Sequence, residues 1–455
     1  MLRRKAYDKL LEWKSRDHKC LLVKGQRQVG KTYIIERFAK DNYKHVIRTN
    51  LAEDEKMRKV FDGNLDVDTI IRGMMLYRNP EDFVPGSTLI FLDEIQECPR
   101  ARSALKAFSI DGRYDVIASG SLLGVVGMWQ TDGKIPPLLP VGYEEHLTMY
   151  SLDFEEFLWA RGITEESVNI VKNCIRERLP IDGAMLNAFS TAFRDYMIVG
   201  GMPAAVASFA QEKNYAAPGK IITEILETCK NDINRYNTKR ESIKTIECFD
   251  SIPAQLAQSN KKFTYSRLSG EGARASAEKY MENLLWIKNA GYGNFCYGLR
   301  QPTHPVEGQV DRNSFKVYLS DTGMLSHMMG QNAIRAIYEG DTAYNMGAVV
   351  ENVVAECLMK CGYPPRYYRK SSGPARMEID FILKFYKDIV AVEVKSGKNR
   401  DAPSLWKIAE HFDIGRRIMF ADSNISVDAE GIETYPLFAA AFADCLEPRW
   451  EMPQF

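Results

Sequence analysis

Residues 25–32 place two glycines, a lysine and a threonine at the spacing G-x-x-x-x-G-K-[ST], a phosphate-binding pattern. An apolar run at 20–23 precedes them, and helical spacing follows them. This order of strand, glycine loop and helix aims backbone amides and the helix dipole at an anion. Lys31 would reach the β- and γ-phosphates of a nucleotide, and Thr32 would ligate Mg²⁺. We therefore expect a nucleotide-binding site made by Gly25, Gln26, Arg27, Gln28, Val29, Gly30, Lys31, Thr32 and Tyr33.

A pair of carboxylates follows another predicted strand. Residues 88–92 are largely apolar, as in a buried strand, and Asp93 and Glu94 come directly after them. An apolar strand that ends in two acids, about sixty residues after a phosphate-binding loop, is typical of a nucleotide-hydrolysis site. Asp93 would hold Mg²⁺ through water, and Glu94 would polarise the attacking water.

A second group of charged residues lies near the C-terminus. Two predicted strands, 378–383 and 389–395, carry Asp380 and the pair Glu393 and Lys395. Strand alternation puts Glu393 and Lys395 on one face, and a hairpin would bring Asp380 to the same place, at the exposed edge of a small mixed sheet. Asp380 and Glu393 would then hold Mg²⁺ or Mn²⁺, and Lys395 would orient the attacking hydroxide.

That arrangement is similar to the PD-(D/E)xK nuclease core, and Glu351 matches the extra acid often found on its first helix. Two alternatives remain open from the residues alone. The domain has a nuclease-like fold without activity, or the charges simply pair at the rim of a sheet.

Taken together, these stretches resemble the prokaryotic AAA-type ATPases, close to the archaeal ATPase group, that carry a C-terminal restriction-endonuclease-like domain of unknown function. The resemblance implies ATP and Mg²⁺ as ligands, a helical lid over the nucleotide, and a phosphate sensor at Ser119 or Ser121. It also makes Arg194 a candidate second sensor. It does not identify the source of an arginine finger, because Gly142 and Tyr143 stand where members often have an arginine. The stretches that carry it are 26–32, 92–96, 119–121, 152–158, 196–203 and 316–323.

The elements that must position these residues suggest an α/β protein of four parts. We expect an AAA-type P-loop domain with a parallel sheet at 1–160 and a helical lid at 161–238. A winged-helix segment would follow at 239–328, and a small PD-(D/E)xK nuclease-like α/β domain at 329–455. Helix, turn, helix and short strands favour the winged helix. Lysines and arginines within 261–279 make it a candidate DNA contact, although packing against protein explains them equally well.

Composition limits the function further. The 455 residues contain 60 Lys+Arg and 60 Asp+Glu, so any nucleic-acid-binding face must be local. No apolar run reaches the length of a membrane span, and nine scattered cysteines favour a cytoplasmic protein. We expect an Mg²⁺-dependent ATPase whose nuclease-like domain acts on or near DNA. The alternatives are a metal-dependent DNA nuclease regulated by ATP and a nucleotide-controlled, non-catalytic switch that binds a protein partner. A homo-oligomer is also compatible with the sequence.

Overall fold

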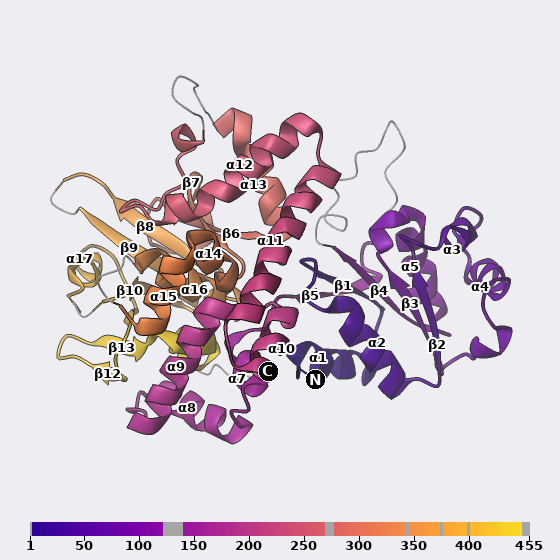
Figure 1. The fold of residues 1–455 in the computed structure, drawn as a ribbon, viewed down its shortest axis with the longest axis horizontal. Helices are drawn as coiled ribbons and strands as arrows, with labels where there is room; N and C mark the ends of the chain where they lie inside the picture. Colours follow the sequence, from indigo (N-terminus) through magenta and orange to yellow (C-terminus); the bar gives the residue numbers. More distant parts are fainter. Residues whose placement is uncertain are drawn as a thin grey trace. The chain divides into compact units, whose positions relative to one another are not determined.

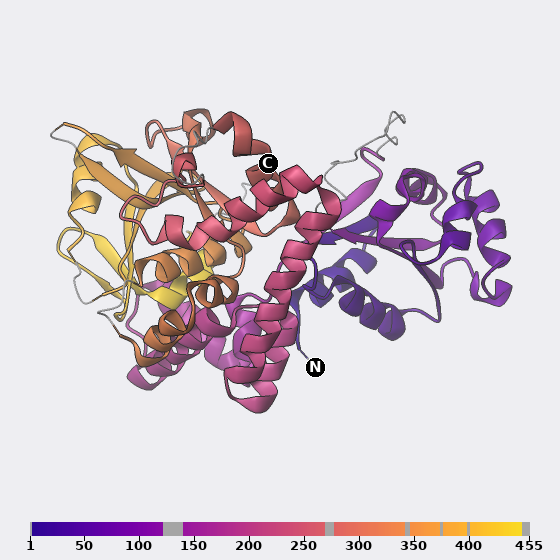
Figure 2. The same cartoon turned by 45° about the horizontal axis from the view of Figure 1, so that its top comes forward.

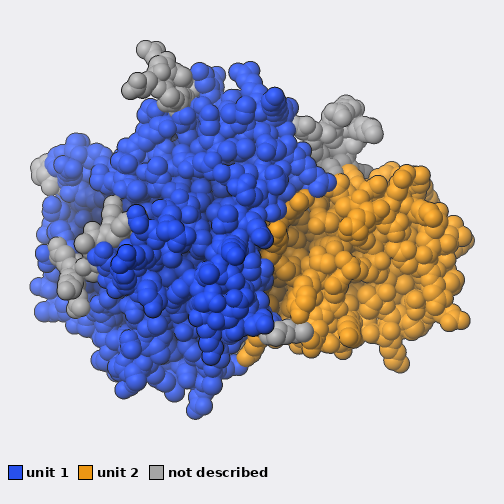
Figure 3. Space-filling view, in the orientation of Figure 1, with its two compact units in different colours: residues 1–2, 152–288, 292–455 blue, residues 3–151, 289–291 orange. Residues whose placement is uncertain are grey.

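The computed structural model describes residues 2–121, 140–268, 277–341, 346–373, 376–397 and 401–447. The chain divides into two compact units, shown in orange and blue in Figure 3. The smaller unit comprises residues 3–151 with 289–291, and the larger comprises residues 1–2, 152–288 and 292–455.

The smaller unit is built on a five-stranded, all-parallel sheet with the strand order β2-β3-β4-β1-β5. Because all strands run in the same direction, their carboxyl ends meet at one edge, where loops can gather polar side chains. The strands are β1 (Cys20–Gly25), β2 (His45–Asn50), β3 (Thr88–Asp93), β4 (Asp115–Ser121) and β5 (Glu144–Met149).

Helices cover both faces of this sheet (Figure 1). Alternate residues of the interior strands enter different cores: Leu21 and Phe91 pack with α1 and α2, whereas Leu22 and Leu92 pack with α3, α4 and α5. Such two-sided burial explains why β1 and β3 are apolar runs rather than alternating patterns. The helices are α1 (Lys5–Lys14), α2 (Lys31–Asn42), α3 (Glu55–Val60), α4 (Val67–Met75) and α5 (Pro99–Asp111).

The larger unit begins with a helical region and continues into a mixed sheet. Its helices are α7 (Phe154–Ala160), α8 (Glu165–Glu177), α9 (Gly183–Val199), α10 (Pro203–Glu212), α11 (Ala216–Tyr236), α12 (Lys239–Leu256), α13 (Ala277–Ala290), α14 (Thr322–Met329), α15 (Gln331–Glu339), α16 (Gly347–Lys360), α17 (Pro403–His411) and α18 (Ala443–Leu446).

Eight strands form the second sheet, in the order β12-β13-β11-β10-β9-β8-β6-β7. Figure 2 shows its orange and yellow strands from a second direction. The strands are β6 (Gly293–Leu299), β7 (Val310–Leu319), β8 (Arg366–Lys370), β9 (Met377–Phe385), β10 (Asp388–Val394), β11 (Arg416–Ala421), β12 (Ser426–Val427) and β13 (Ile432–Pro436). The predicted hairpin is present as the antiparallel pair β9 and β10.

Two expectations about this region need correction. Strands β6 and β7, expected in a separate winged-helix segment, belong to the eight-stranded sheet because β6 pairs in parallel with β8. Apart from residues 289–291, the segments 239–328 and 329–455 therefore lie in one compact unit. In addition, β10 lies between β9 and β11, so the C-terminal charged group is at the ends of interior strands and not on an edge strand.

Three of the stretches that carry the family resemblance meet inside the larger unit and have a structural role there: 152–158, 196–203 and 316–323. Asp153 and Glu156 form a reciprocal capping box that starts α7. The Leu152 amide donates to the Gly201 carbonyl at 2.6 Å, and the Gly201 amide donates to Asp321 Oδ2 at 2.8 Å. A Cβ on Gly200 would lie 2.0 Å from Asp321 Oδ1, so only glycine fits this junction.

Candidate functional site

The phosphate-binding loop joins the end of β1 to the start of α2. Gln28 and Gly30 adopt left-handed conformations, with φ of 65° and 89°, which turn the chain back toward the helix. Gly30 is the N-cap of α2, and since glycine has no side chain, no capping group competes for the first amides of the helix. The loop therefore has the backbone of an anion-binding helix start.

Gly25 is required for packing in addition to its predicted nucleotide contact. Its φ is not positive, but a Cβ there would lie 2.3 Å from the Met149 carbonyl oxygen of the neighbouring strand β5. The motif predicts Gly25 to be part of the nucleotide-binding site, and that contact stays a prediction. The structure places it in a close contact between two strands, so packing alone already requires glycine at this position.

Lys31 is buried at the first position of α2 and points back over the loop. Its ammonium donates to the carbonyl oxygens of Gly25 at 3.0 Å and Gln26 at 2.9 Å. Burial lowers the pKa of Lys31 to about 8, although Glu94 and Asp93 oppose the shift. The lysine is thus a desolvated group inside the loop, where we predict that phosphate binds.

Asp93 is the centre of the predicted hydrolysis site. The Thr32 hydroxyl donates to the Asp93 carboxylate, at 3.1 Å from Oδ2 and 3.3 Å from Oδ1. The Ser119 hydroxyl also donates a hydrogen bond to Asp93 Oδ1. Strand pairing explains the arrangement, because β3 and β4 are neighbours and α2 starts beside them. Of the two serines left open by the sequence, Ser119 therefore contacts the acid, whereas Ser121 is aligned with Gly25 at the end of β1.

Glu94 leaves the strand in a left-handed conformation, with φ of 52°. Its amide donates to Asp93 Oδ1 at 3.2 Å, and its carboxylate accepts a hydrogen bond from the Gln96 side chain. Non-glycine residues are uncommon in the left-handed region of backbone conformation. This conformation turns the chain at Glu94 sharply away from the direction of β3. Gln96 holds the carboxylate that we predict to orient water.

The motifs did not identify Gln96 or Arg48 as members of the site. Arg48 of β2 pairs with Glu36 of α2, and its Nη2 lies 3.7 Å from Asp93 Oδ2. A glutamine two residues after the acid pair was visible in the sequence, but the position of Arg48 depended on β2 lying beside β3. Tyr33 is 54% exposed on the first turn of α2, and its predicted nucleotide contact stays a prediction.

The C-terminal charged residues also come together. The Val394 amide donates to Asp380 Oδ2 at 2.9 Å, and Lys395 Nζ donates to Glu393 Oε1 at 2.8 Å. The second oxygen of Glu393 is buried and has no hydrogen-bond partner. Burial, followed by the charge of Glu351, raises the pKa of Asp380, while burial is the main cause of the raised pKa of Glu393.

Glu351, the extra helix acid, is held by other residues. Lys316 Nζ lies 2.9 Å from Glu351 Oε1, Lys261 pairs with Oε2, and the Tyr318 hydroxyl donates to Oε1. Lys261 was expected to contribute to a DNA-binding face, but its ammonium points into this acidic network. Within the described residues, no group of three or more His, Cys, Asp or Glu side chains is placed to hold a metal ion.

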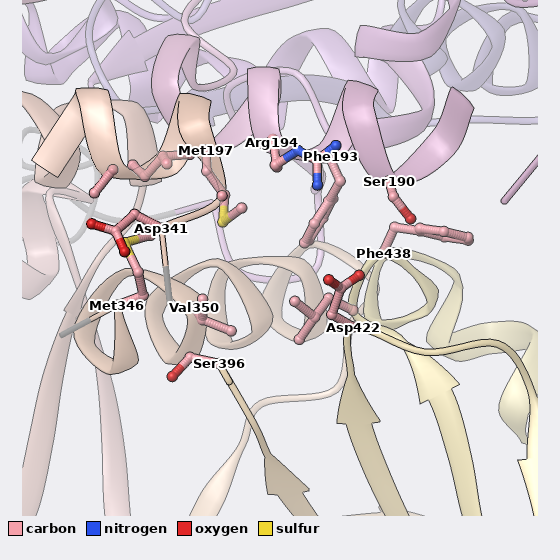
Figure 4. A pocket seen from close by; sticks show the side chains of 14 residues that line it. Ser190, Phe193, Arg194, Met197, Asp341, Met346, Val350, Ser396, Asp422 and Phe438 are labelled. Carbon is pink, nitrogen blue, oxygen red and sulfur yellow. The ribbon is translucent and has the colours of Figure 1, made fainter. Parts of the chain in front are cut away.

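Arg194 lies on α9 in the larger unit and lines a cavity of about 80 Å³ (Figure 4). Phe193, Met197 and Phe438 supply part of its apolar wall, and Asp422 enters from the end of β11. The expected role of Arg194 as a nucleotide sensor stays a prediction.

None of the described helices is long and apolar enough to cross a membrane.

Comparison with known families identifies the smaller unit. Residues 17–158 match the AAA domain family, so the chain carries an AAA-type P-loop ATPase domain. Residues 190–335 and 346–438 match two domains of unknown function, DUF8612 and DUF4143. The DUF8612 match extends across the boundary that we expected near residue 238, consistent with the continuity of the larger unit.

Similar solved structures include the Walker-type ATPase PABY2304 of Pyrococcus abyssi, at 12% identity over 74% of this chain and 96% of that chain, with a TM-score of 0.42. The RuvB Holliday junction branch migration motor of Thermotoga maritima has 14% identity over 64% and 89%, with a TM-score of 0.29. Both TM-scores are below 0.5, so no functional inference rests on these similarities. No curated protein matches the sequence significantly.

Proposed function

We propose that the chain binds ATP and hydrolyses it with Mg²⁺. The main support is that the Thr32 and Ser119 hydroxyls both donate hydrogen bonds to Asp93. Thr32 follows Lys31 in the chain, and Ser119 lies on β4, the strand beside β1 and its glycine loop. Hydroxyl and carboxylate oxygens at adjacent positions are the donor set that Mg²⁺ takes in this class of site, so the residues fit the ion.

Each residue has a distinct part in the proposed reaction. Thr32 and Asp93 would hold Mg²⁺, which when bound neutralises charge on the β- and γ-phosphate oxygens. Lys31 binds those oxygens as a fixed positive charge, and the first amides of α2 bind them as dipoles. Glu94 orients the attacking water and accepts its proton, while Gln96 keeps the Glu94 carboxylate in position.

The first test is ATP turnover by the full chain, compared with Lys31→Ala. We expect the variant to remain folded and to lose ATP binding or turnover, because a point charge on phosphate is removed. Lys24→Ala, which changes a half-buried lysine of the preceding strand β1, serves as the matched control. Equal turnover by wild type and Lys31→Ala would contradict the assignment.

Coupling to DNA and the rival switch function can be separated in the same assay. If the larger unit acts on or near DNA, added DNA should change ATP turnover. A nucleotide-controlled switch that binds a protein partner would instead show tight ATP binding with slow or no turnover. Turnover that DNA does not alter would count against a DNA-processing enzyme.

A second candidate function is supported by one observation, the buried and unpartnered Oε2 atom of Glu393. With Asp380 and Lys395 beside it, we propose that this oxygen belongs to a site for one divalent cation, of the kind that hydrolyses phosphodiesters. Mg²⁺ often takes only one or two carboxylates and completes its shell with water and substrate phosphates. Burial raises the pKa values of both acids, and a bound cation would stabilise the charged form that burial disfavours.

Its test is Mn²⁺ binding and plasmid cleavage by the full chain and by Asp380→Asn. We expect the variant to lose both, whereas Asp413→Asn, an exposed acid of the same unit, should lose neither. Metal binding without cleavage in the wild type would leave a cation-binding centre without nuclease activity. Metal binding that Asp380→Asn leaves intact would contradict the proposed site.

A further inference from the structure

Lys316 is a buried lysine at the centre of the C-terminal acidic group. It lies on β7, is 1% exposed, and places its Nζ 2.9 Å from Glu351 Oε1 and 3.4 Å from Glu378 Oε1. Burial alone would lower the pKa of Lys316, but Glu351, Asp380 and Glu378 outweigh it and leave the pKa above its ordinary value. A full positive charge is therefore built into the centre.

Glu351 is correspondingly unavailable to any other cation. Lys316 and the Tyr318 hydroxyl contact its Oε1, and Lys261 contacts its Oε2. Although burial raises the pKa of Glu351, the two lysines lower it to about 2, so the carboxylate is ionised and paired. Glu393 differs from Glu351, because one of its oxygens is buried without a partner.

The formal charges of the centre balance without a metal. Four carboxylates, Glu351, Glu378, Asp380 and Glu393, face three lysines and one arginine: Lys261, Lys316, Lys395 and Arg369. Removing one partner of a buried ion pair is strongly destabilising, because the other charge remains buried. Lys316 therefore holds Glu351 and Glu378 in the way that a bound cation would hold them.

We propose that the Lys316 ammonium is a permanent cation of this centre, which removes Glu351 and Glu378 from the ligand set. The centre then takes at most one divalent cation, at Asp380 and Glu393, and its second positive charge is the lysine. The Asp380–Glu393 half of this statement rests on the second candidate function above. The Lys316 half rests only on the contacts of Lys316 and Glu351.

The experiment uses the full chain with Asp93→Asn, so that Mn²⁺ binding reports on the C-terminal centre. Lys316→Met should lower the thermal midpoint in EDTA, because Glu351 and Glu378 each lose one of their counter-charges and keep only Lys261 and Arg369. Added Mn²⁺ should then raise the midpoint by more than it does in the parent and bind at least about tenfold more tightly, the scale on which a metal's surroundings change its affinity. In the parent, Mn²⁺ should bind with a stoichiometry of one at most.

The double variant Lys316→Met/Glu351→Gln is the matched control, since it removes the lysine together with its main acid. Its midpoint in EDTA should return toward that of the parent, and the extra gain with Mn²⁺ should disappear. This variant also decides the matter if Lys316→Met alone does not fold. A double variant that is no more stable than Lys316→Met would contradict the proposed balance of charges.

Two further results would overturn the proposal. One is a Lys316→Met chain with the parent's midpoint in EDTA and the parent's Mn²⁺ binding. The other is loss of Mn²⁺ binding in Glu351→Gln, which would make Glu351 a ligand. A parent that binds no Mn²⁺ would instead refute the Asp380–Glu393 site, while a gain of Mn²⁺ binding in Lys316→Met would still support the role of the lysine.

Discussion

Replacing Glu94 by glutamine should separate ATP binding from ATP hydrolysis. The substitution keeps the shape of the side chain and removes only its charge and basicity. The amide oxygen of glutamine can still accept the hydrogen bond from Gln96, and the backbone amide can still donate to Asp93. Both residue types pay a similar cost for the left-handed φ of 52°, so the fold around β3 should not change.

The expected size of the effect follows from the role of the carboxylate. A positioned general base contributes roughly 10²–10⁴ in rate. At about 1.36 kcal/mol per tenfold, the barrier should rise by about 2.7–5.4 kcal/mol. ATP binding should be unchanged or slightly tighter, because Lys31, Thr32 and Asp93 remain and one negative charge near the phosphates is lost.

Phosphate release under saturating ATP measures kcat, and titration with a fluorescent ATP analogue measures Kd. Glu81→Gln, an exposed acid in the same unit, is the control for removing a carboxylate. Hydrolysis at the wild-type rate would show that Glu94 does not orient the water. If Glu94→Gln loses binding together with hydrolysis, the roles given to Asp93 and Glu94 are misassigned.

Two further predictions concern the same unit. Gly25→Ala should weaken the pairing of β1 with β5, because its Cβ would lie 2.3 Å from the Met149 carbonyl oxygen. In urea unfolding, the free energy of unfolding should fall by about 1–3 kcal/mol. The control is Gly63→Ala, whose Cβ would have no atom within 4 Å and which should leave the stability nearly unchanged. Ser119→Ala removes a hydrogen bond to an ionised acid, worth about 1.5–3 kcal/mol, and should weaken Mg²⁺-dependent ATP binding; an unchanged Mg²⁺ dependence in a binding titration would exclude Ser119 from the site.

Local sequence predicted the parts of the nucleotide site whose geometry is local. Strand, glycine loop and helix follow one another within residues 20–42, so their order was sufficient to place Lys31 and Thr32. The acid pair at the end of β3 was visible for the same reason. The partners of Asp93 were harder to predict, because Ser119 and Arg48 reach it only through the strand order β2-β3-β4.

The C-terminal centre depended more strongly on distant contacts. The hairpin of β9 and β10 was predictable from two apolar runs with a short polar turn, and it brings Asp380 near Glu393. Lys316 and Lys261 come from a segment that we expected to be a separate winged helix. Their contact with Glu351 exists because β6 and β7 extend the same sheet.

The sequence by itself determined the class of the first unit and the identity of its chemical groups, because a phosphate-binding loop is a short stretch whose residues act through their own backbone. Only the tertiary structure decided which acids of the C-terminal centre have counter-charges. Whether a buried carboxylate is available to a metal depends on the charges packed around it, and Glu351 and Glu393 differ in this respect although both are acids of the same apparent motif. Those neighbours come from strands and helices far apart in the chain, where residue spacing carries no information.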